Sequence, residues 1–178
     1  MRLAAMLGAA CLGAAGATAV PAGTVTALPP QVPSQCAASE RVLYSCAFPR
    51  GTGSLCAGKT SVHYRFGPRG HPDIDLASRP DWSNVHTGFV RGQGSGHQSH
   101  VRLTTGRFHY VIFEGADGYL TEDPGRTYSG IAVLKGPQGE QELATLACPG
   151  RAVIALDDAW LSRHAAGEKD GGPFDIWY

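Results

Sequence analysis

The sequence predicts an all-β fold: an antiparallel β-sandwich or small barrel of about eight strands, with one short C-terminal helix and two disulfides. Three observations support this prediction. Short runs that alternate apolar and polar residues recur between Gly- and Pro-rich breaks, as in strands joined by turns. Helix signals are confined to one short stretch near the C-terminus. Four cysteines follow an apolar N-terminal run, and exported chains usually oxidise an even cysteine set.

The N-terminal run has the character of an export signal. Residues 3–20 are uncharged and apolar or small, and they follow a single basic residue, Arg2. A small-x-small pattern predicts cleavage after Ala19, and Ala27 is a second candidate. We therefore assign 1–19 to a signal peptide and expect an exported protein, periplasmic or secreted.

The mature chain is long enough for one domain. Residues 20–35 hold four prolines and no charge, which predicts a mobile leader, and 36–178 form a single β domain. Without Arg2 the chain keeps 14 basic residues, one fewer than the 15 of the whole sequence, against 15 acidic ones. This balance gives no electrostatic reason to bind nucleic acid. We expect a monomer with no membrane insertion.

Five strands are expected in the first half of the domain. Alternation is clearest where Val62, Tyr64 and Phe66 share one face. Turn residues such as Gly67-Pro68 separate the runs. The expected strands are Arg41–Phe48, Ser54–Ala57, Thr60–Phe66, Asp73–Ala77 and Trp82–Val90.

Two hairpins and a helix are expected in the second half. Thr105-Gly106 turns between a run near Val101 and the aromatic run Arg107–Phe113. Ile131–Leu134 and Glu140–Ala147 form the second hairpin. Asp157 and Asp158 favour a helix N-terminus ahead of Ala159–His164. The apolar end, Phe174–Tyr178, either docks on the domain or forms an exposed tail.

The disulfide pairing stays open at the level of sequence. If the first two strands form a hairpin, Cys46 and Cys56 would bridge neighbouring strands and leave Cys36 to pair with Cys148. Four cysteines allow three pairings, and the sequence excludes none of them.

Histidines suggest one enzymatic alternative. His97, His100 and His109 flank the clearest hairpin, and three converging imidazoles would suit a metal-dependent hydrolase. In a regular strand, however, residues three apart point to opposite faces. We therefore expect no metal and no other cofactor, and a protein that is not an enzyme.

Aromatic residues in loops are the better candidates for binding. Tyr119 and Tyr128 lie in a polar stretch that is long for a hairpin connection, and Trp82 precedes a strand. Such rings stack on the apolar faces of sugars. Ser95 and His97, in the Gly-rich segment before the clearest hairpin, complete the candidate ligand-binding set.

Several runs resemble the small exported, disulfide-containing β-domains of Gram-negative bacteria, namely Val42–Cys46, Val62–Gly67, His86–Phe89 and Phe108–Phe113. The chain is also similar, remotely, to periplasmic lysozyme inhibitors in size, export and disulfide use. The c-type group of those inhibitors carries a Ser-Gly-x-x-Tyr loop. Here Ser95-Gly96 and Ser129-Gly130 begin such a motif, and neither is followed by the tyrosine.

The disulfide-stapled scaffold, the aromatic residues in loops and the absence of a catalytic motif favour an exported, non-enzymatic domain that binds a cell-envelope protein or glycan. An inhibitor of a wall-degrading enzyme is one concrete form of this hypothesis. Two alternatives stay open. One is the metal-dependent hydrolase at His97, His100 and His109, and the other is a structural component of the envelope.

Overall fold

A computed structural model describes residues 32–178. The signal peptide expected at 1–19, and most of the leader expected at 20–35, lie outside the described residues. The end of that leader is not mobile as expected, because Pro33 and Gln35 hydrogen-bond to strand residues. The domain therefore extends at least to Pro33.

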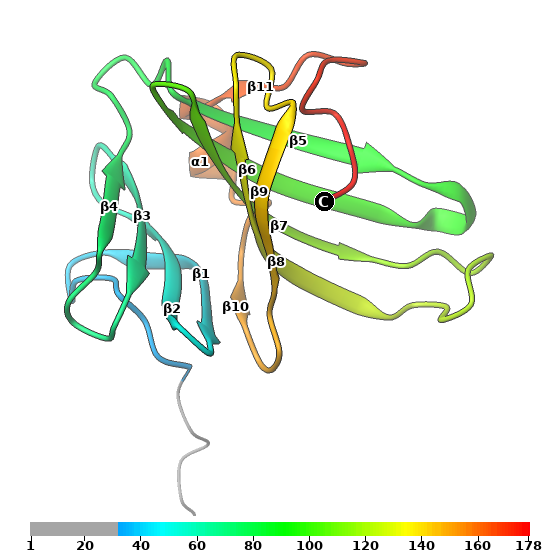
Figure 1. Cartoon of the computed structure of the whole chain (residues 1–178), viewed down its shortest axis with the longest axis horizontal. Coiled ribbons are helices and arrows are strands. Elements are labelled where there is room, and N and C mark those ends of the chain that lie inside the picture. Colours follow the sequence, from blue (N-terminus) through cyan, green and yellow to red (C-terminus); the bar gives the residue numbers. More distant parts are fainter. Residues whose placement is uncertain (1–31) are drawn as a thin grey trace, which may run out of the picture. The chain divides into compact units, whose positions relative to one another are not determined.

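The described chain is an all-β sandwich of two sheets (Figure 1). Sheet A has the order β10-β1-β2-β3-β4, and sheet B the order β11-β5-β6-β7-β8-β9. All strand pairs are antiparallel except β11 with β5. The strands of sheet A are β1 (Arg41–Phe48), β2 (Gly51–Ala57), β3 (Val62–Gly67), β4 (Ile74–Ala77) and β10 (Val153–Ile154). Those of sheet B are β5 (Val85–Arg91), β6 (His97–Thr105), β7 (Phe108–Ala116), β8 (Thr127–Lys135), β9 (Gln141–Ala147) and β11 (Ala166–Gly167).

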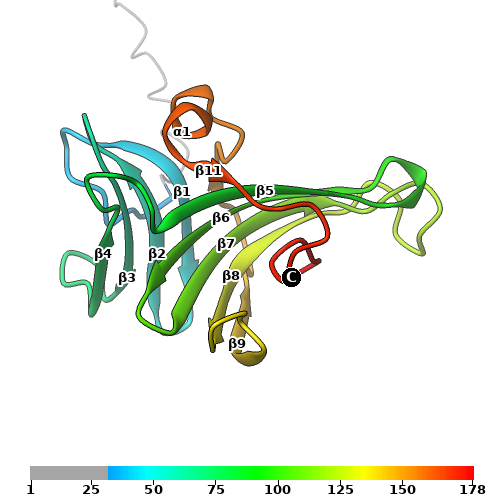
Figure 2. The same ribbon diagram turned by 90° about the horizontal axis from the view of Figure 1, so that it is seen from above.

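The predicted strands and both predicted hairpins are present with small shifts of their ends. The described chain has eleven strands rather than about eight, because the structure adds β10 and β11, each of two residues, to the nine expected runs. Sheet A covers only one end of sheet B. The other ends of β5 to β8 project beyond it and carry the β5–β6 turn and the β7–β8 loop (Figure 2).

The main core lies between the two sheets. On β6 the alternation places Val101 and Leu103 in this core, while Arg102 faces the opposite side of sheet B. Tyr64 of β3 and Tyr110 of β7 pack across the interface with ring centroids 5.2 Å apart. Burying such rings removes large apolar areas from water, which stabilises the contact between the sheets.

A second, smaller core lies on the outer face of sheet B. Here the C-terminal segment 168–178 crosses the sheet, and Phe174 joins Val111, Phe113, Ala132 and Leu134 in one buried cluster. The apolar C-terminal end therefore docks, which was one of the two expected outcomes. Sheet B is covered on both faces over this region.

The predicted helix is confirmed as α1 (Ala159–His164). The carboxylate of Asp158 accepts hydrogen bonds from the backbone N–H groups of Trp160 and Leu161, which caps the helix. Leu161 is buried in the main core, and Trp160 meets the edge of Trp82. No helix among the described residues is long and apolar enough to cross a membrane.

Two disulfides form, as predicted, but the favoured pairing is wrong. The bonds join Cys36 to Cys56 and Cys46 to Cys148. In the β1–β2 register Cys46 lies opposite Gly53 and faces the main core, whereas Cys56 lies opposite Val42 on the other face of sheet A. Two cysteines on opposite faces of a sheet cannot bond. The two disulfides fit an oxidising compartment outside the cytosol.

The two disulfides connect different parts of the fold. Cys46–Cys148 joins β1 of sheet A to the residue that follows β9 of sheet B, so it ties the sheets together. Cys36–Cys56 fastens the first described residues to the outer face of sheet A. Beside it, Gln35 donates from its side chain to the carbonyl oxygen of Gly67 and accepts from the backbone N–H of Gly70.

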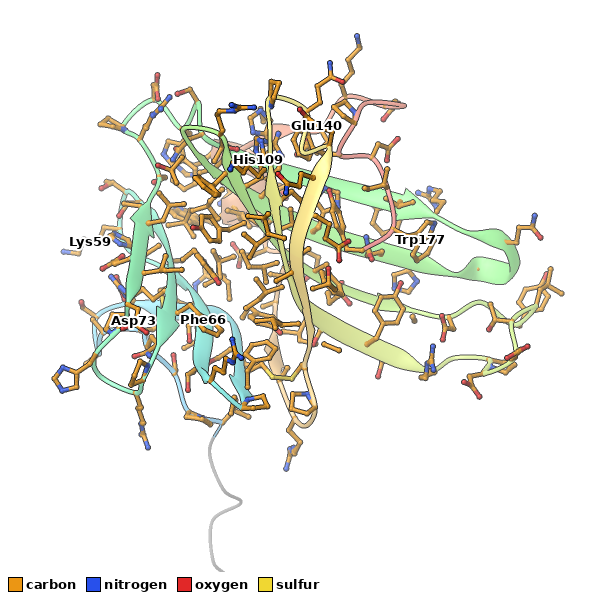
Figure 3. All side chains as sticks on the ribbon, viewed as in Figure 1. Lys59, Phe66, Asp73, His109, Glu140 and Trp177 are labelled. Carbon is orange, nitrogen blue, oxygen red and sulfur yellow. A yellow bond between two sulfur atoms is a disulfide. The ribbon has the colours of Figure 1, made fainter. Side chains whose placement is uncertain are left out.

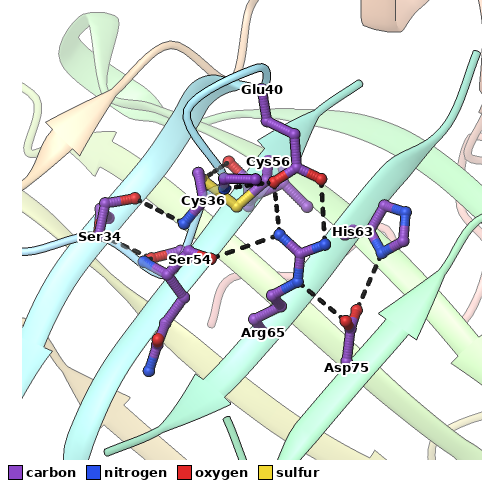
Figure 4. Close-up of polar contacts among 12 residues, drawn as sticks. Ser34, Cys36, Glu40, Ser54, Cys56, His63, Arg65 and Asp75 are labelled. Atoms are coloured by element: carbon purple, nitrogen blue, oxygen red, sulfur yellow. Dashed lines mark hydrogen bonds and ion pairs between the residues drawn. A yellow bond between two sulfur atoms is a disulfide. The ribbon is translucent and has the colours of Figure 1, made fainter. Parts of the chain in front are cut away.

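An ion-pair network supports this N-terminal attachment (Figure 4). The guanidinium of Arg65 donates two hydrogen bonds to the carboxylate of Glu40, and the one from Nη2 is 3.0 Å long. Its Nε donates to Asp75, also at 3.0 Å. His63 contacts the other oxygen of Asp75. The hydrogen bond from Arg65 lowers the pKa of Glu40, which keeps the Glu40–Arg65 pair charged in mildly acidic solution.

Removing Cys46–Cys148 should destabilise the domain more than removing Cys36–Cys56. The bonds close segments of 102 and 20 residues, and loop length alone makes the longer bond worth about 1.4 kcal/mol more. Guanidinium unfolding of the two double Cys→Ala variants measures this difference. Equal unfolding free energies would mean that strain or residual structure outweighs chain entropy.

Candidate functional site

The predicted ligand-binding residues divide into two groups in the structure. Ser95, His97 and Tyr119 lie at the free end of sheet B. Trp82 does not, and the expectation of an exposed stacking ring is wrong for it: the residue is 8% exposed and packs against Trp160 and His164. Tyr128 is half-buried in β8 against Phe113, so it is not a loop residue.

The free end of sheet B is built from two connections that lie against each other. We call residues 92–96, 116–121 and Trp177 the tip. The β5–β6 turn is tight, because Gly92 N–H donates to the carbonyl oxygen of Gly96. Gly94 and Ser95 both have positive φ, 61° and 65°. For serine this conformation is uncommon, so the surrounding contacts hold the turn in it.

Glycines let the two backbones approach closely. Tyr119 N–H donates to the carbonyl oxygen of Gly94 at 2.8 Å. A Cβ on Gly94 would lie 2.7 Å from the backbone nitrogen of Leu120, and a Cβ on Gly96 would lie 3.0 Å from that of Gly118. Side chains at these positions would push the turn and the loop apart. The tip is therefore two loops fused through their backbones.

The β7–β8 loop is also braced internally. Asp117 exchanges backbone hydrogen bonds with Gly125 and Arg126, and its carboxylate accepts from Arg126 Nε at 2.9 Å. Thr121 Oγ1 donates to the carbonyl oxygen of Gly118 at 2.7 Å. These bonds give the loop a defined shape that projects beyond the sandwich.

The tip exposes apolar side chains around a cavity of about 320 Å³. Leu120, 65% exposed, and Trp177, 46% exposed, line this cavity, and Tyr119, 68% exposed, precedes Leu120 in the same loop. Ile176, the neighbour of Trp177 in the chain, is also partly exposed. The cavity is lined by Gly92, Gln93, Gly96, Ala116, Asp117, Gly118, Leu120, Thr121 and Trp177. Exposed apolar residues gathered at one place mark a binding surface more than scattered ones do.

Trp177 reaches the tip because the C-terminal segment is anchored on the outer face of sheet B (Figure 3). Arg102 of β6 donates two hydrogen bonds to Glu168, at 2.6 and 3.0 Å, and its guanidinium lies 3.9 Å from the ring centre of Phe174. Farther along, the side chain of Gln98 bonds the backbone of Ile176 and of Tyr178. Trp177 is thus held from both sides.

The three histidines proposed as metal ligands do not converge. His97 stacks on Phe89, on the face of sheet B opposite to that of His100. His100 is buried under Tyr178. His109 uses both ring nitrogens, one toward Thr104 and the other toward the carbonyl oxygen of Gly136. The hydrolase hypothesis loses its ligand set.

Another group of potential metal ligands contains two sulfur atoms that form a disulfide. Among the described residues, the cluster of ligand atoms close enough for one metal ion is Cys36, Glu40 and Cys56. Since both sulfurs belong to a disulfide, they are not available as thiolates.

Sequence reasoning missed Leu120 and Trp177 as members of the site. The apolar C-terminal end was visible in the sequence, but its destination was not. Comparison of the chain with family models, with curated proteins and with solved structures finds no match. We therefore infer function from the geometry of the tip.

Acid should weaken the anchoring of the C-terminal segment through His100. Neither ring nitrogen has a partner among residues 32–178, and burial lowers the pKa of His100 to about 4. The unfolded chain takes up this proton below about pH 6.5. The folded state does not take up this proton until the pH approaches 4. The free energy of unfolding is therefore highest above pH 6.5 and is about 2–3 kcal/mol lower at pH 4.5.

Urea unfolding at pH 7.5 and 4.5 tests this dependence. His100→Leu should reduce the acid loss by about 2–3 kcal/mol, whereas His71→Leu, a change at an exposed histidine, should leave it unchanged. The same acid loss in both variants would contradict the assignment to His100.

Proposed function

We propose that this protein is an exported, non-enzymatic binding domain that inserts its tip into a concave site on a cell-envelope protein, such as a wall-degrading enzyme. The observation that carries the proposal is the projection of a braced double loop, with Tyr119 and Leu120 exposed at its edge, beyond a disulfide-stapled sandwich (Figure 2).

The physical basis is preorganisation. Binding costs less entropy when the inserted loops already hold their bound shape. The backbone bonds between the β5–β6 turn and the β7–β8 loop, and the Asp117–Arg126 pair, hold this shape in the free protein. Exposed Tyr and Trp side chains are the residue types that dominate binding energy at protein interfaces.

A glycan ligand is the weaker candidate for the same surface. Sugar sites combine an aromatic platform with polar side chains that bond hydroxyl groups. At the tip, the carboxylate of Asp117 is paired with Arg126, and the hydroxyl of Thr121 donates within its own loop. These two polar side chains of the cavity are thus engaged within the protein, while its apolar edge is open, which favours a protein partner.

The test is titration of the oxidised domain into wall-lysis assays with c-, g- and i-type lysozymes. We expect stoichiometric inhibition of one type. Tyr119→Ala combined with Leu120→Ser should weaken inhibition by roughly 100-fold or more, since central interface side chains contribute about 2–4 kcal/mol each. The melting temperature should stay unchanged because both side chains are mostly exposed.

Leu143→Ser, a change at an exposed leucine on β9, is the matched control and should inhibit like the unchanged protein. Full inhibition by the tip variant would contradict the proposal. Absence of inhibition by the unchanged protein would also contradict it. In that case co-sedimentation with purified wall glycan is measured next. Co-sedimentation alone would favour the glycan-binding or structural alternative.

A further inference from the structure

A second cavity, of about 420 Å³, lies on the outer face of sheet B at the end away from the tip. Its floor is formed by side chains of β5, β6 and β7, and its rim by the connections before β5 and after β6 and β8. Figure 3 shows His109 in this region, well separated from Trp177. The lining residues are Arg79, Ser83, Asn84, His86, Arg102, Thr104, Gly106, His109, Pro137 and Phe174.

Most polar groups of this cavity are satisfied within the protein. Asn84 donates to the carbonyl oxygens of Ala77 and Thr104 and accepts from Arg79 N–H. His109 bonds at both ring nitrogens. Asn84 and His109 are therefore held in place by bonds within the protein, and neither is the group that we expect a ligand to contact.

Arg102 is likewise committed. Its guanidinium bonds Glu168 twice and Thr104 once, and the side chains of Arg102 and Glu168 are only 7% and 9% exposed. Glu168 therefore balances the charge of Arg102 within the wall of the cavity, so Arg102 adds little net attraction for a charged ligand.

Two groups remain uncommitted within the described part of the chain. The Nδ1 atom of His86 is buried and has no hydrogen-bond partner there. Arg79 makes one long side-chain contact, 3.4 Å to Ser83 Oγ, and no ion pair within 4.0 Å. One is a guanidinium that carries only donors, and the other is an imidazole that becomes a double donor when protonated.

The charges around His86 and Arg79 favour an anion. No carboxylate lines the cavity. Burial, the largest effect, lowers the pKa of His86; the nearby Arg102 lowers it further, and Glu168, the partner of Arg102, raises it. Asp81 lies near Arg79 but is fully exposed, so solvent screens it.

We propose that this cavity binds a small oxyanion, the carboxylate, phosphate or sulfate group of a ligand, between Arg79 and His86. Arg79 supplies charge and paired donors, and His86 supplies a further N–H. Pro137 and Phe174 offer apolar walls to the part of the ligand that carries the anion. This site is independent of the tip and of the function proposed for it.

Sulfate is the probe of choice, because its charge stays constant between pH 5.5 and 8. NMR of the histidine ring nitrogens, with sodium chloride at equal ionic strength as reference, should show saturable shifts confined to His86 and His109. Since the anion stabilises protonated His86, affinity should rise as the pH falls through this range, and sulfate should raise the pKa of His86.

Arg79→Gln should weaken sulfate binding by about 10-fold or more, and Arg69→Gln, the same change in an exposed loop of the other sheet, should leave it unchanged. His86→Phe should remove the pH dependence, measured through the rise in melting temperature that sulfate produces. Shifts that only follow ionic strength, or binding that is equal in the Arg79 and Arg69 variants, would overturn the proposal.

Discussion

The buried ion pair of Arg102 and Glu168 is the interaction on which both candidate surfaces depend. It fixes the start of the C-terminal segment to the outer face of sheet B, and Phe174 then packs over the same guanidinium. From there the segment carries Trp177 to the wall of the tip cavity. Phe174 also forms a wall of the cavity at the opposite end. A buried pair of this kind is costly to break on one side, so it defines one path for the segment.

Covering both faces of sheet B explains the sequence of its central strands. On β7, Ile112 points into the main core while Val111 and Phe113 point into the second core. A strand with one face in water alternates apolar and polar residues, whereas a strand buried on both faces is apolar throughout. The run from Tyr110 to Phe113 is therefore apolar throughout because the docked C-terminal segment covers its outer face.

The projecting end of sheet B follows from unequal strand lengths. β6, β7 and β8 each have nine residues, and sheet A covers only part of them. The uncovered end has no second sheet to bury its side chains. Its loops hold together through backbone contacts at Gly94, Gly96 and Gly118, which leaves Tyr119 and Leu120 free to face a partner.

The sequence alone determined the all-β class, both hairpins and the cap of α1, because alternation, turn residues and Asp158 act through neighbours in the chain. Only the tertiary structure decided the disulfide pairing, the burial of Trp82 and the separation of the three histidines. Each depends on strand register or on which face a distant segment covers. The pairing of Arg102 with Glu168 spans 66 residues, and no local pattern encodes it. The position of Trp177 beside the tip loops depends on this pairing, so only tertiary packing decides that part of the candidate site.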